Sequence, residues 1–184
     1  MQSYDYARRE GVEEISWERF ADLSRVLAEK LAARRVDAIV GIARAGLFPA
    51  TAVACALRCD LHPVRVTRRA NDAVIALHPV WKVDVPAEVR GKVVAVVDEI
   101  ADTGQTLSIV AQRARELGAA RVVTATLVSH SWANPMPEVV GLTTDALVIF
   151  PWDRQVHTGD GWQPHPELAA ALRLQGLSPS HAQP

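Results

Sequence analysis

The stretch that decides the fold is VVAVVDEIADTGQTL, residues 93–107. Its first five residues are four valines and an alanine, a composition typical of a strand buried on both faces of a parallel sheet. Two acids, Asp98 and Glu99, follow the apolar run, and the segment DTGQT, residues 102–106, leads into a helical pattern at 104–117. The stretch therefore predicts a buried strand, a polar turn and a helix.

Elements of the same two kinds alternate on both sides of this stretch. Apolar residues spaced three and four apart predict helices, and short apolar runs bounded by turn residues predict strands. The further expected helices cover 17–33, 47–57 and 166–174, and the expected strands cover 37–42, 61–67, 92–97, 121–128 and 146–150. This alternation favours an α/β fold with a doubly wound, mainly parallel sheet flanked by helices.

Composition narrows the class of protein. The chain has 184 residues, 49% of them hydrophobic, which is enough for one core of ordinary size. Its 20 Lys and Arg nearly balance 21 Asp and Glu without runs of like charge, so general nucleic-acid binding is not expected. Because no apolar stretch approaches the roughly 20 residues that span a bilayer, and no signal-peptide core is present, we expect a cytoplasmic protein.

Polar residues gather where the expected strands end. Ligands of open α/β sheets bind beyond the carboxyl ends of the strands. Adjacent carboxylates such as Asp98 and Glu99 are costly there unless they meet hydroxyls or a cation, and a ribose diol with Mg²⁺ would satisfy both needs. In residues 102–106, backbone N–H groups, two hydroxyls and a helix N-terminus converge, which predicts a phosphate site.

The whole stretch resembles the phosphoribosyl pyrophosphate (PRPP) motif of type I phosphoribosyltransferases. In that family a hydrophobic strand is followed by two acids, two variable residues and D/A-T-G-x-T. The resemblance implies that Asp98 and Glu99 bind the ribose hydroxyls, directly or through Mg²⁺, and that Asp102 lies beside the imidazole edge of a purine. It also implies a 5'-phosphate site made of Thr103, Gly104, Gln105 and Thr106.

A second segment, GIARAG at residues 41–46, resembles the loop of the same family that binds the leaving diphosphate. The resemblance assigns diphosphate binding to Arg44, Ala45 and Gly46, with Arg44 also supplying catalytic charge. The family often has glycine where Ala45 stands. A backbone that required glycine at this position would therefore be strained in this chain.

The residues that would bind the base depart from the family pattern. FPWD, residues 150–153, resembles the element that closes the base pocket in xanthine-guanine-type enzymes, and the resemblance assigns Asp153 to the metal site. His130 stands where purine-using members usually have lysine, and Leu147 replaces the aromatic residue that often stacks on the base. The expected base pocket therefore consists of His130, Leu147 and the backbone of Val148.

The resemblance also suggests how the chain is divided. We expect an N-terminal extension at 1–16, a phosphoribosyltransferase domain at 17–175 and a disordered tail at 176–184. Within the domain, a flap is expected at about 68–90 and a base-pocket hood at about 129–165. In the flap, Arg68, Arg69 and Lys82 are candidates to reach the diphosphate.

Together these residues predict a Mg²⁺-dependent enzyme that transfers phosphoribose from PRPP to guanine, xanthine or hypoxanthine. The resemblance further implies a homodimer or higher homo-oligomer. Two alternatives stay open: a noncatalytic regulatory protein that binds PRPP or a nucleotide, and phosphoribosyl transfer to a specialised non-purine acceptor.

Overall fold

The protein is described from a computed structural model covering residues 9, 11–67, 69–70, 73–74 and 80–177, with 69–70 and 73–74 described by their backbone alone. The chain divides into two compact units. Unit 1 consists of residues 1–20 and 144–184, and unit 2 of residues 21–143. Within the ranges above, no helix has the length and apolar character needed to cross a bilayer.

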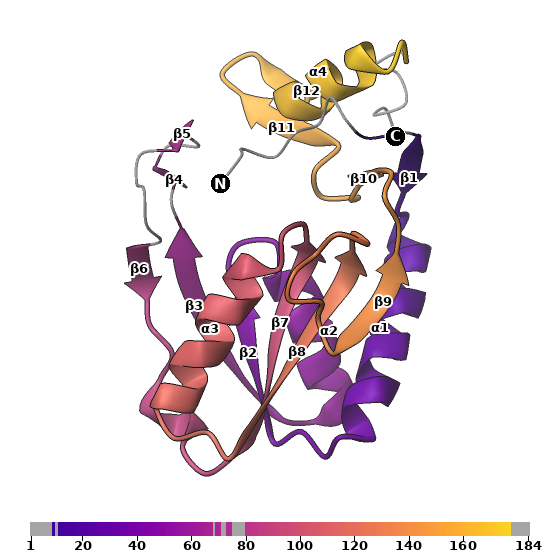
Figure 1. The fold of residues 1–184 in the computed structure, drawn as a ribbon. Helices are drawn as coiled ribbons and strands as arrows, with labels where there is room; N and C mark the ends of the chain where they lie inside the picture. Colours follow the sequence, from indigo (N-terminus) through magenta and orange to yellow (C-terminus); the bar gives the residue numbers. More distant parts are fainter. Residues whose placement is uncertain (1–8, 10, 68, 71–72, 75–79, 178–184) are drawn as a thin grey trace. The chain divides into compact units, whose positions relative to one another are not determined.

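Unit 2 is built on a six-stranded sheet in the order β6-β3-β2-β7-β8-β9 (Figure 1). Five neighbouring strands are parallel, and only the edge strand β6 runs antiparallel to its neighbour β3. The strands are β2 (Ala38–Ile42), β3 (Asp60–Thr67), β6 (Val80–Val83), β7 (Val93–Ala101), β8 (Arg121–Ser129) and β9 (Val139–Thr143). The predicted doubly wound, mainly parallel sheet is confirmed.

Helices cover both faces of this sheet. The helices that connect the parallel strands are α2 (Leu47–Leu57) and α3 (Gln105–Glu116), and α1 (Trp17–Ala32) precedes β2. In Figure 1, α3 lies in front of the sheet, and α1 and α2 lie behind it. Gly41 of β2 permits this close packing, because a Cβ there would lie 2.7 Å from the Cβ of Ala50 in α2. The helices begin and end within two residues of the positions that the sequence predicted.

The core between α3 and the sheet is made almost entirely of small branched side chains. Val40, Val94 and Val96 from β2 and β7 are fully buried against Val110 and Ala114 of α3. Valine suits this position because its branched side chain packs well on a pleated surface that is covered by a helix. The resulting tight layer fixes the carboxyl end of β7 relative to the start of α3.

The segment between β3 and β7 contains the β-structure that the sequence pattern suggested. β4 (Arg69–Ala70) pairs antiparallel with β5 (Ala73–Val74), and the 3₁₀ turn η2 (Ala87–Val89) precedes β7. Lys82 is exposed on β6, whereas Arg68 and the side chain of Arg69 lie outside the described residues.

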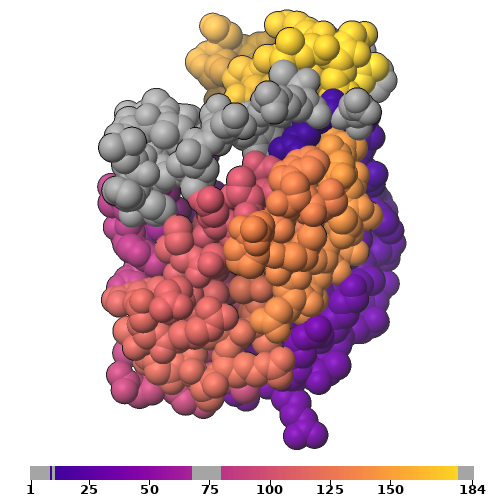
Figure 2. All heavy atoms as spheres, in the orientation of Figure 1, coloured from indigo at the N-terminus to yellow at the C-terminus, as the bar shows by residue number. Residues whose placement is uncertain are grey.

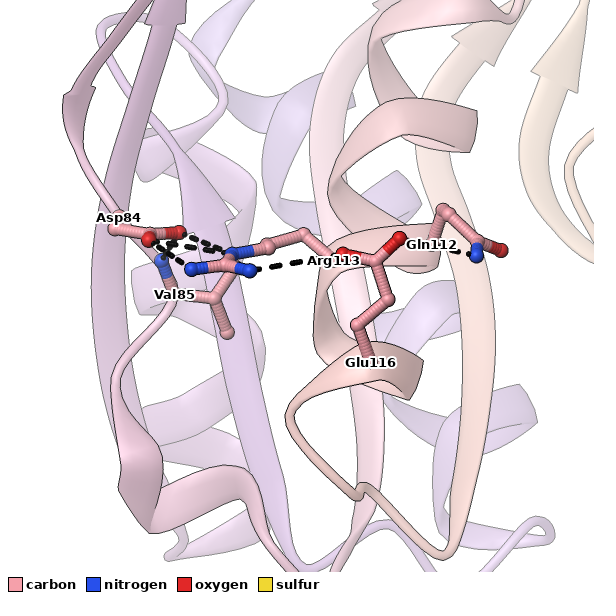
Figure 3. A network of polar contacts seen from close by, with 5 residues as sticks. All are labelled: Asp84, Val85, Gln112, Arg113 and Glu116. Atoms are coloured by element: carbon pink, nitrogen blue, oxygen red, sulfur yellow. Dashed lines mark hydrogen bonds and ion pairs between the residues drawn. The ribbon is translucent and has the colours of Figure 1, made fainter.

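An ion pair fastens this segment to α3 (Figure 3). Arg113 donates to both carboxylate oxygens of Asp84, with Nη2 2.6 Å from Oδ2 and Nε 2.9 Å from Oδ1. The hydrogen bonds from Arg113 lower the pKa of Asp84 below its ordinary value. Because both side chains are more than a third exposed, the pair adds little to global stability. Its effect is local: it sets the direction of the chain between β6 and β7.

Unit 1 combines residues that are far apart in sequence. β1 (Val12–Glu14) pairs parallel with β10 (Leu147–Ile149), and β11 (Gln155–Thr158) pairs antiparallel with β12 (Gly161–Pro164). Helix α4 (Pro166–Leu174) packs its buried Leu168 and Leu172 against Leu147 and Ile149. The predicted short helix is thus confirmed, and part of the predicted N-terminal extension forms a strand. Residues 178–184 of the predicted tail lie outside the described ranges.

Two strand predictions were wrong in detail. The segment expected as the fifth strand of the sheet, 146–150, forms β10 and pairs with β1 instead of β8. β8 pairs with β7 on one side, and its partner on the other side is β9, which the sequence did not indicate because Gly141 interrupts its apolar pattern. Gly141 is needed there, since a Cβ would lie 2.6 Å from the carbonyl oxygen of Leu127 in β8.

Candidate active site

The strand order has its switch point between β2 and β7. These two strands are neighbours in the centre of the sheet, yet the chain leaves β2 toward β3 and leaves β7 toward β8. The loops that follow them therefore diverge, and the carboxyl ends of strands at such a switch point form the usual ligand site of an open α/β sheet. The loop after β2 carries Arg44, and β7 with its following turn carries the predicted PRPP motif.

The sequence had suggested that the two acids come after the strand. In the structure they lie inside β7. The ladder with β8 continues through Ala101, and Asp98 pairs in register with Thr126. Asp98 is buried, and its Oδ1 accepts a 3.0 Å hydrogen bond from the N–H of Glu99. Burial, and next the charge of Glu99, raise the pKa of Asp98 well above its ordinary value. The site therefore contains a carboxyl group that gains from a diol or a cation.

The predicted diphosphate loop lies directly against this carboxyl group. A Cβ placed on Gly46 would come within 2.5 Å of Asp98 Oδ1 and within 2.5 Å of the carbonyl oxygen of Ile42. Only glycine fits this approach, which brings the first turn of α2 onto the acid pair. Arg44, two residues earlier, is exposed.

The backbone of this loop shows whether alanine is strained at position 45, where the family often has glycine. Among the described residues, positive φ angles at non-glycine positions occur only at Arg35 and Arg58, so Ala45 does not occupy a glycine-like conformation. Because Ala45 does not need a glycine-like φ angle, alanine is compatible with the conformation of this loop. The peptide bond between Ala43 and Arg44 is cis.

The predicted phosphate turn joins β7 to α3. Gly104 is the N-cap of α3 with φ of 77°, a left-handed conformation that favours glycine. The N–H of Gln105 donates to Thr103 Oγ1 at 3.4 Å, while Gln105 and Thr106 are exposed. The turn thus presents the first amides of a twelve-residue helix and the two threonine hydroxyls, which is the donor set that a phosphate requires.

The segment after β8 packs on this turn. The N–H of His130 donates to the carbonyl oxygen of Ala101 at 3.1 Å, and the N–H of Asn134 donates to that of Thr103 at 3.0 Å. A Cβ on Gly104 would overlap the carbonyl oxygen of Pro135. In Figure 2 this segment, in orange, lies against the pink atoms that precede and begin α3.

One residue of this segment contacts the predicted site and was missed by sequence reasoning. The indole Nε1 of Trp132 donates to Asp102 Oδ1 at 3.2 Å, and the indole stacks on the ring of His130 with centroids 4.5 Å apart. His130 is fully buried, whereas Trp132 is 46% exposed. The only sequence signal was an aromatic residue just beyond the carboxyl end of a strand, at a position where the family pattern had already loosened.

The remaining predicted site residues belong to unit 1. Leu147 is fully buried against α4, and Asp153 donates its N–H to the carbonyl oxygen of Phe150. Trp152 stacks on Phe150 and meets Phe20 edge to face, with centroids 4.9 and 5.4 Å apart. Trp152 is thus an anchor for the aromatic cluster of unit 1.

The backbone groups of Val148, a buried residue of β10, are not used in the pairing with β1. Leu147 donates its N–H to the carbonyl oxygen of Gly11, and Ile149 accepts a hydrogen bond from the N–H of Ile15. In a parallel pair, the residue between two such positions directs its N–H and C=O away from the partner strand. The backbone of Val148 therefore points away from β1, as base recognition by this residue would need.

The strand switch point carries a buried Asp98 with the half-buried Glu99 beside it, a helix N-terminus at Gly104 and an exposed Arg44. This combination is typical of α/β proteins that bind phosphorylated ligands. The family model described as phosphoribosyl transferase domain matches residues 11–153. The chain belongs to the phosphoribosyltransferase family, as the sequence motifs predicted.

Individual relatives agree with this assignment. The chain is 30% identical over 145 residues to xanthine-guanine phosphoribosyltransferase of Idiomarina loihiensis, covering 78% of this chain and 88% of that protein. The crystal structure of a purine phosphoribosyltransferase from Pyrococcus horikoshii matches with a TM-score of 0.69 and 29% identity, covering 77% of this chain and 93% of that one. A hypothetical protein from Neisseria gonorrhoeae with bound ppGpp has the same fold, with a TM-score of 0.67 and 22% identity over 91% of this chain and 97% of that one.

Proposed function

We propose that this protein is a purine salvage enzyme, which transfers the 5-phosphoribosyl group of PRPP to guanine, xanthine or hypoxanthine. The observation that carries the proposal is the approach of Gly46 to Asp98, which brings the diphosphate loop onto the acid pair. The names of the Idiomarina and Pyrococcus relatives, which are purine enzymes, support the class of acceptor.

In the proposed reaction a ring nitrogen of the purine attacks C1 of PRPP as the bond from C1 to the diphosphate oxygen breaks. Asp98 and Glu99 bind the ribose hydroxyls, and the turn from Thr103 to Thr106 binds the 5'-phosphate, so the sugar is fixed at both ends. Arg44 offsets the charge that grows on the diphosphate. Asp102 accepts the proton that the purine loses on forming the nucleoside monophosphate.

Magnesium fits this donor set as a partner shared with the substrate. Within the described ranges, no three Asp, Glu, His or Cys side chains are close enough to hold a metal ion by themselves. Mg²⁺ commonly uses one or two protein carboxylates and completes its shell with water and substrate phosphates. Asp98 and Glu99 are the proposed ligands, and the assignment of Asp153 to the metal site stays a prediction from the sequence. The ion would supply charge to stabilise the departing diphosphate.

The proposed function is tested by measuring diphosphate release from PRPP and Mg²⁺ with six bases in turn. Guanine, hypoxanthine or xanthine is expected to support turnover, and adenine, uracil and orotate are expected to support little. Turnover with a pyrimidine alone would contradict the proposed acceptor. Tight PRPP binding without turnover on any base would instead favour the regulatory alternative.

Asp102→Asn separates the base end of the site from the PRPP end. The amide has nearly the shape of the carboxylate but cannot accept the purine proton, so turnover is expected to fall about 100- to 10,000-fold. PRPP affinity, measured by calorimetry without a base, is expected to change little. Equal turnover in the variant and the wild type would remove the proposed role of Asp102.

A further inference from the structure

The indole of Trp132 is fixed from the interior of unit 2. Its ring lies nearly parallel to that of His130, with an interplanar angle of 14°. The imidazole of His130 is fully buried, and the backbone N–H of that residue is bonded to Ala101 at the end of β7. The orientation of the indole is therefore set by a group that cannot move without disturbing the sheet.

This fixed indole in turn orients Asp102. Asp102 lies in the turn between β7 and α3, where its side chain is only half-buried. An indole N–H is a donor only, so it selects a single kind of partner, and here it donates to Oδ1 of the carboxylate at 3.2 Å. Because a donor prefers to lie near the plane of the carboxylate, this hydrogen bond restricts the orientation of that plane and so the position of the second oxygen.

Packing alone does not account for a tryptophan at this position. Trp132 is 46% exposed, and the stack on His130 would be made equally well by a phenylalanine. The property that distinguishes tryptophan from phenylalanine here is the N–H group that reaches Asp102. The contact joins residues 30 positions apart in the chain and links the segment after β8 with the PRPP motif.

We propose that Trp132 is a positioning residue, which holds the Asp102 carboxylate in the plane where it accepts the proton of the purine. This inference rests on the proposed function, because it gives the orientation of Asp102 a use in phosphoribosyl transfer. It assigns to the segment after β8 a part in proton transfer, through Trp132 and the His130 ring on which it stacks.

Trp132→Phe tests the hydrogen bond while keeping the stack. Turnover with the preferred purine is expected to fall about 10- to 100-fold, the range for a lost hydrogen bond to a charged group. The KM for PRPP is expected to stay within about twofold, because the ribose and phosphate groups are not touched. Trp17→Phe is the matched control, since Trp17 is 53% exposed, begins α1 and belongs to none of the segments assigned to the site. The control is expected to keep wild-type turnover.

A double variant and a spectrum separate positioning from other roles. If Trp132 acts through Asp102, Trp132→Phe is expected to add little to the loss caused by Asp102→Asn. The indole N–H resonance of Trp132, assigned by its absence in Trp132→Phe, is expected to shift in Asp102→Asn and to stay in place in Arg121→Gln. An unshifted resonance would overturn the proposed contact.

The activity measurements distinguish the two proposals from each other. Wild-type turnover that is unchanged in Trp132→Phe overturns the positioning role and leaves the proposed function intact. Loss in Trp132→Leu without loss in Trp132→Phe would show that the ring stacks and that its N–H group is not used. Absence of turnover on every base in the wild type overturns the proposed function, and with it the catalytic use of the contact.

Discussion

Asp98→Asn is expected to raise the melting temperature of the protein at neutral pH and at the same time to weaken PRPP binding about 10- to 100-fold. Asp98 is buried in β7 beside Glu99, and burial raises its pKa. A buried group without full compensation costs about 1–3 kcal/mol, and about 1 kcal/mol shifts the melting temperature of a chain of this length by roughly 2–4 °C. Asparagine has the same shape without the charge, so a rise of roughly 2–12 °C is expected at pH 7.5.

The pH dependence follows from the direction of the pKa shift. Because the pKa of Asp98 is higher in the folded state than in the unfolded state, the folded state retains a proton that the unfolded state loses. Stability is therefore highest below the unfolded pKa, near 4, and falls as pH rises toward the folded pKa. The difference in melting temperature between Asp98→Asn and the wild type is expected to be small at pH 4 and to grow toward neutral pH.

Scanning calorimetry between pH 4 and 8, without substrate, measures this difference, and titration with PRPP and Mg²⁺ measures the loss of affinity. Glu99→Gln is the matched comparison, since it removes the charge of Glu99 but leaves Asp98 buried, and burial is the larger cause of the raised pKa. It is expected to weaken PRPP binding and to raise the melting temperature less than Asp98→Asn does. A lower melting temperature for Asp98→Asn at pH 7.5 would mean that the carboxylate stabilises the fold, contrary to this account.

The sequence predicted the strand, turn and helix that carry the PRPP motif because the information for them is local. The valine run, the acids and the residues around Gly104 all lie within 93–107, and each corresponds to one step from strand to turn to helix. The length of β7 was underestimated for a physical reason. Asp98 and Glu99 interrupt the apolar pattern, yet the ladder with β8 continues past them to Ala101.

The features that the sequence did not predict depend on contacts between distant segments. β1 has only three residues, two of them acidic, and becomes a strand because β10 pairs with it. The contact between Trp132 and Asp102 depends on the path of the chain after β8, which no local pattern specifies. The base pocket is hard to predict from the sequence for the same reason, because its candidate residues come from two different strands and the segments beside them.

Gly46→Ala is expected to disrupt stability and substrate binding together. The added methyl group would lie 2.5 Å from Asp98 Oδ1, 2.5 Å from the carbonyl oxygen of Ile42 and 2.9 Å from the Asp98 Cα. Two of these three atoms belong to the backbone, so a side-chain rotation cannot relieve the overlap. The start of α2 must move away from β7, which costs about 1–3 kcal/mol for a single overpacked methyl group.

This movement would also separate the diphosphate loop from the acid pair. Arg44 lies two residues before Gly46, so it would move away from Asp98 together with the start of α2. Gly46→Ala is therefore expected to melt roughly 2–12 °C below the wild type and to show weak PRPP binding at a temperature where it is still folded. Gly159→Ala is the matched control, since a Cβ there meets no atom within 4 Å and φ is not positive; its stability should stay within about 0.5 kcal/mol of the wild type. If Gly46→Ala kept wild-type stability and PRPP affinity, the approach of α2 to Asp98 would not be needed for the site, and the proposed junction of diphosphate loop and ribose clamp would be wrong.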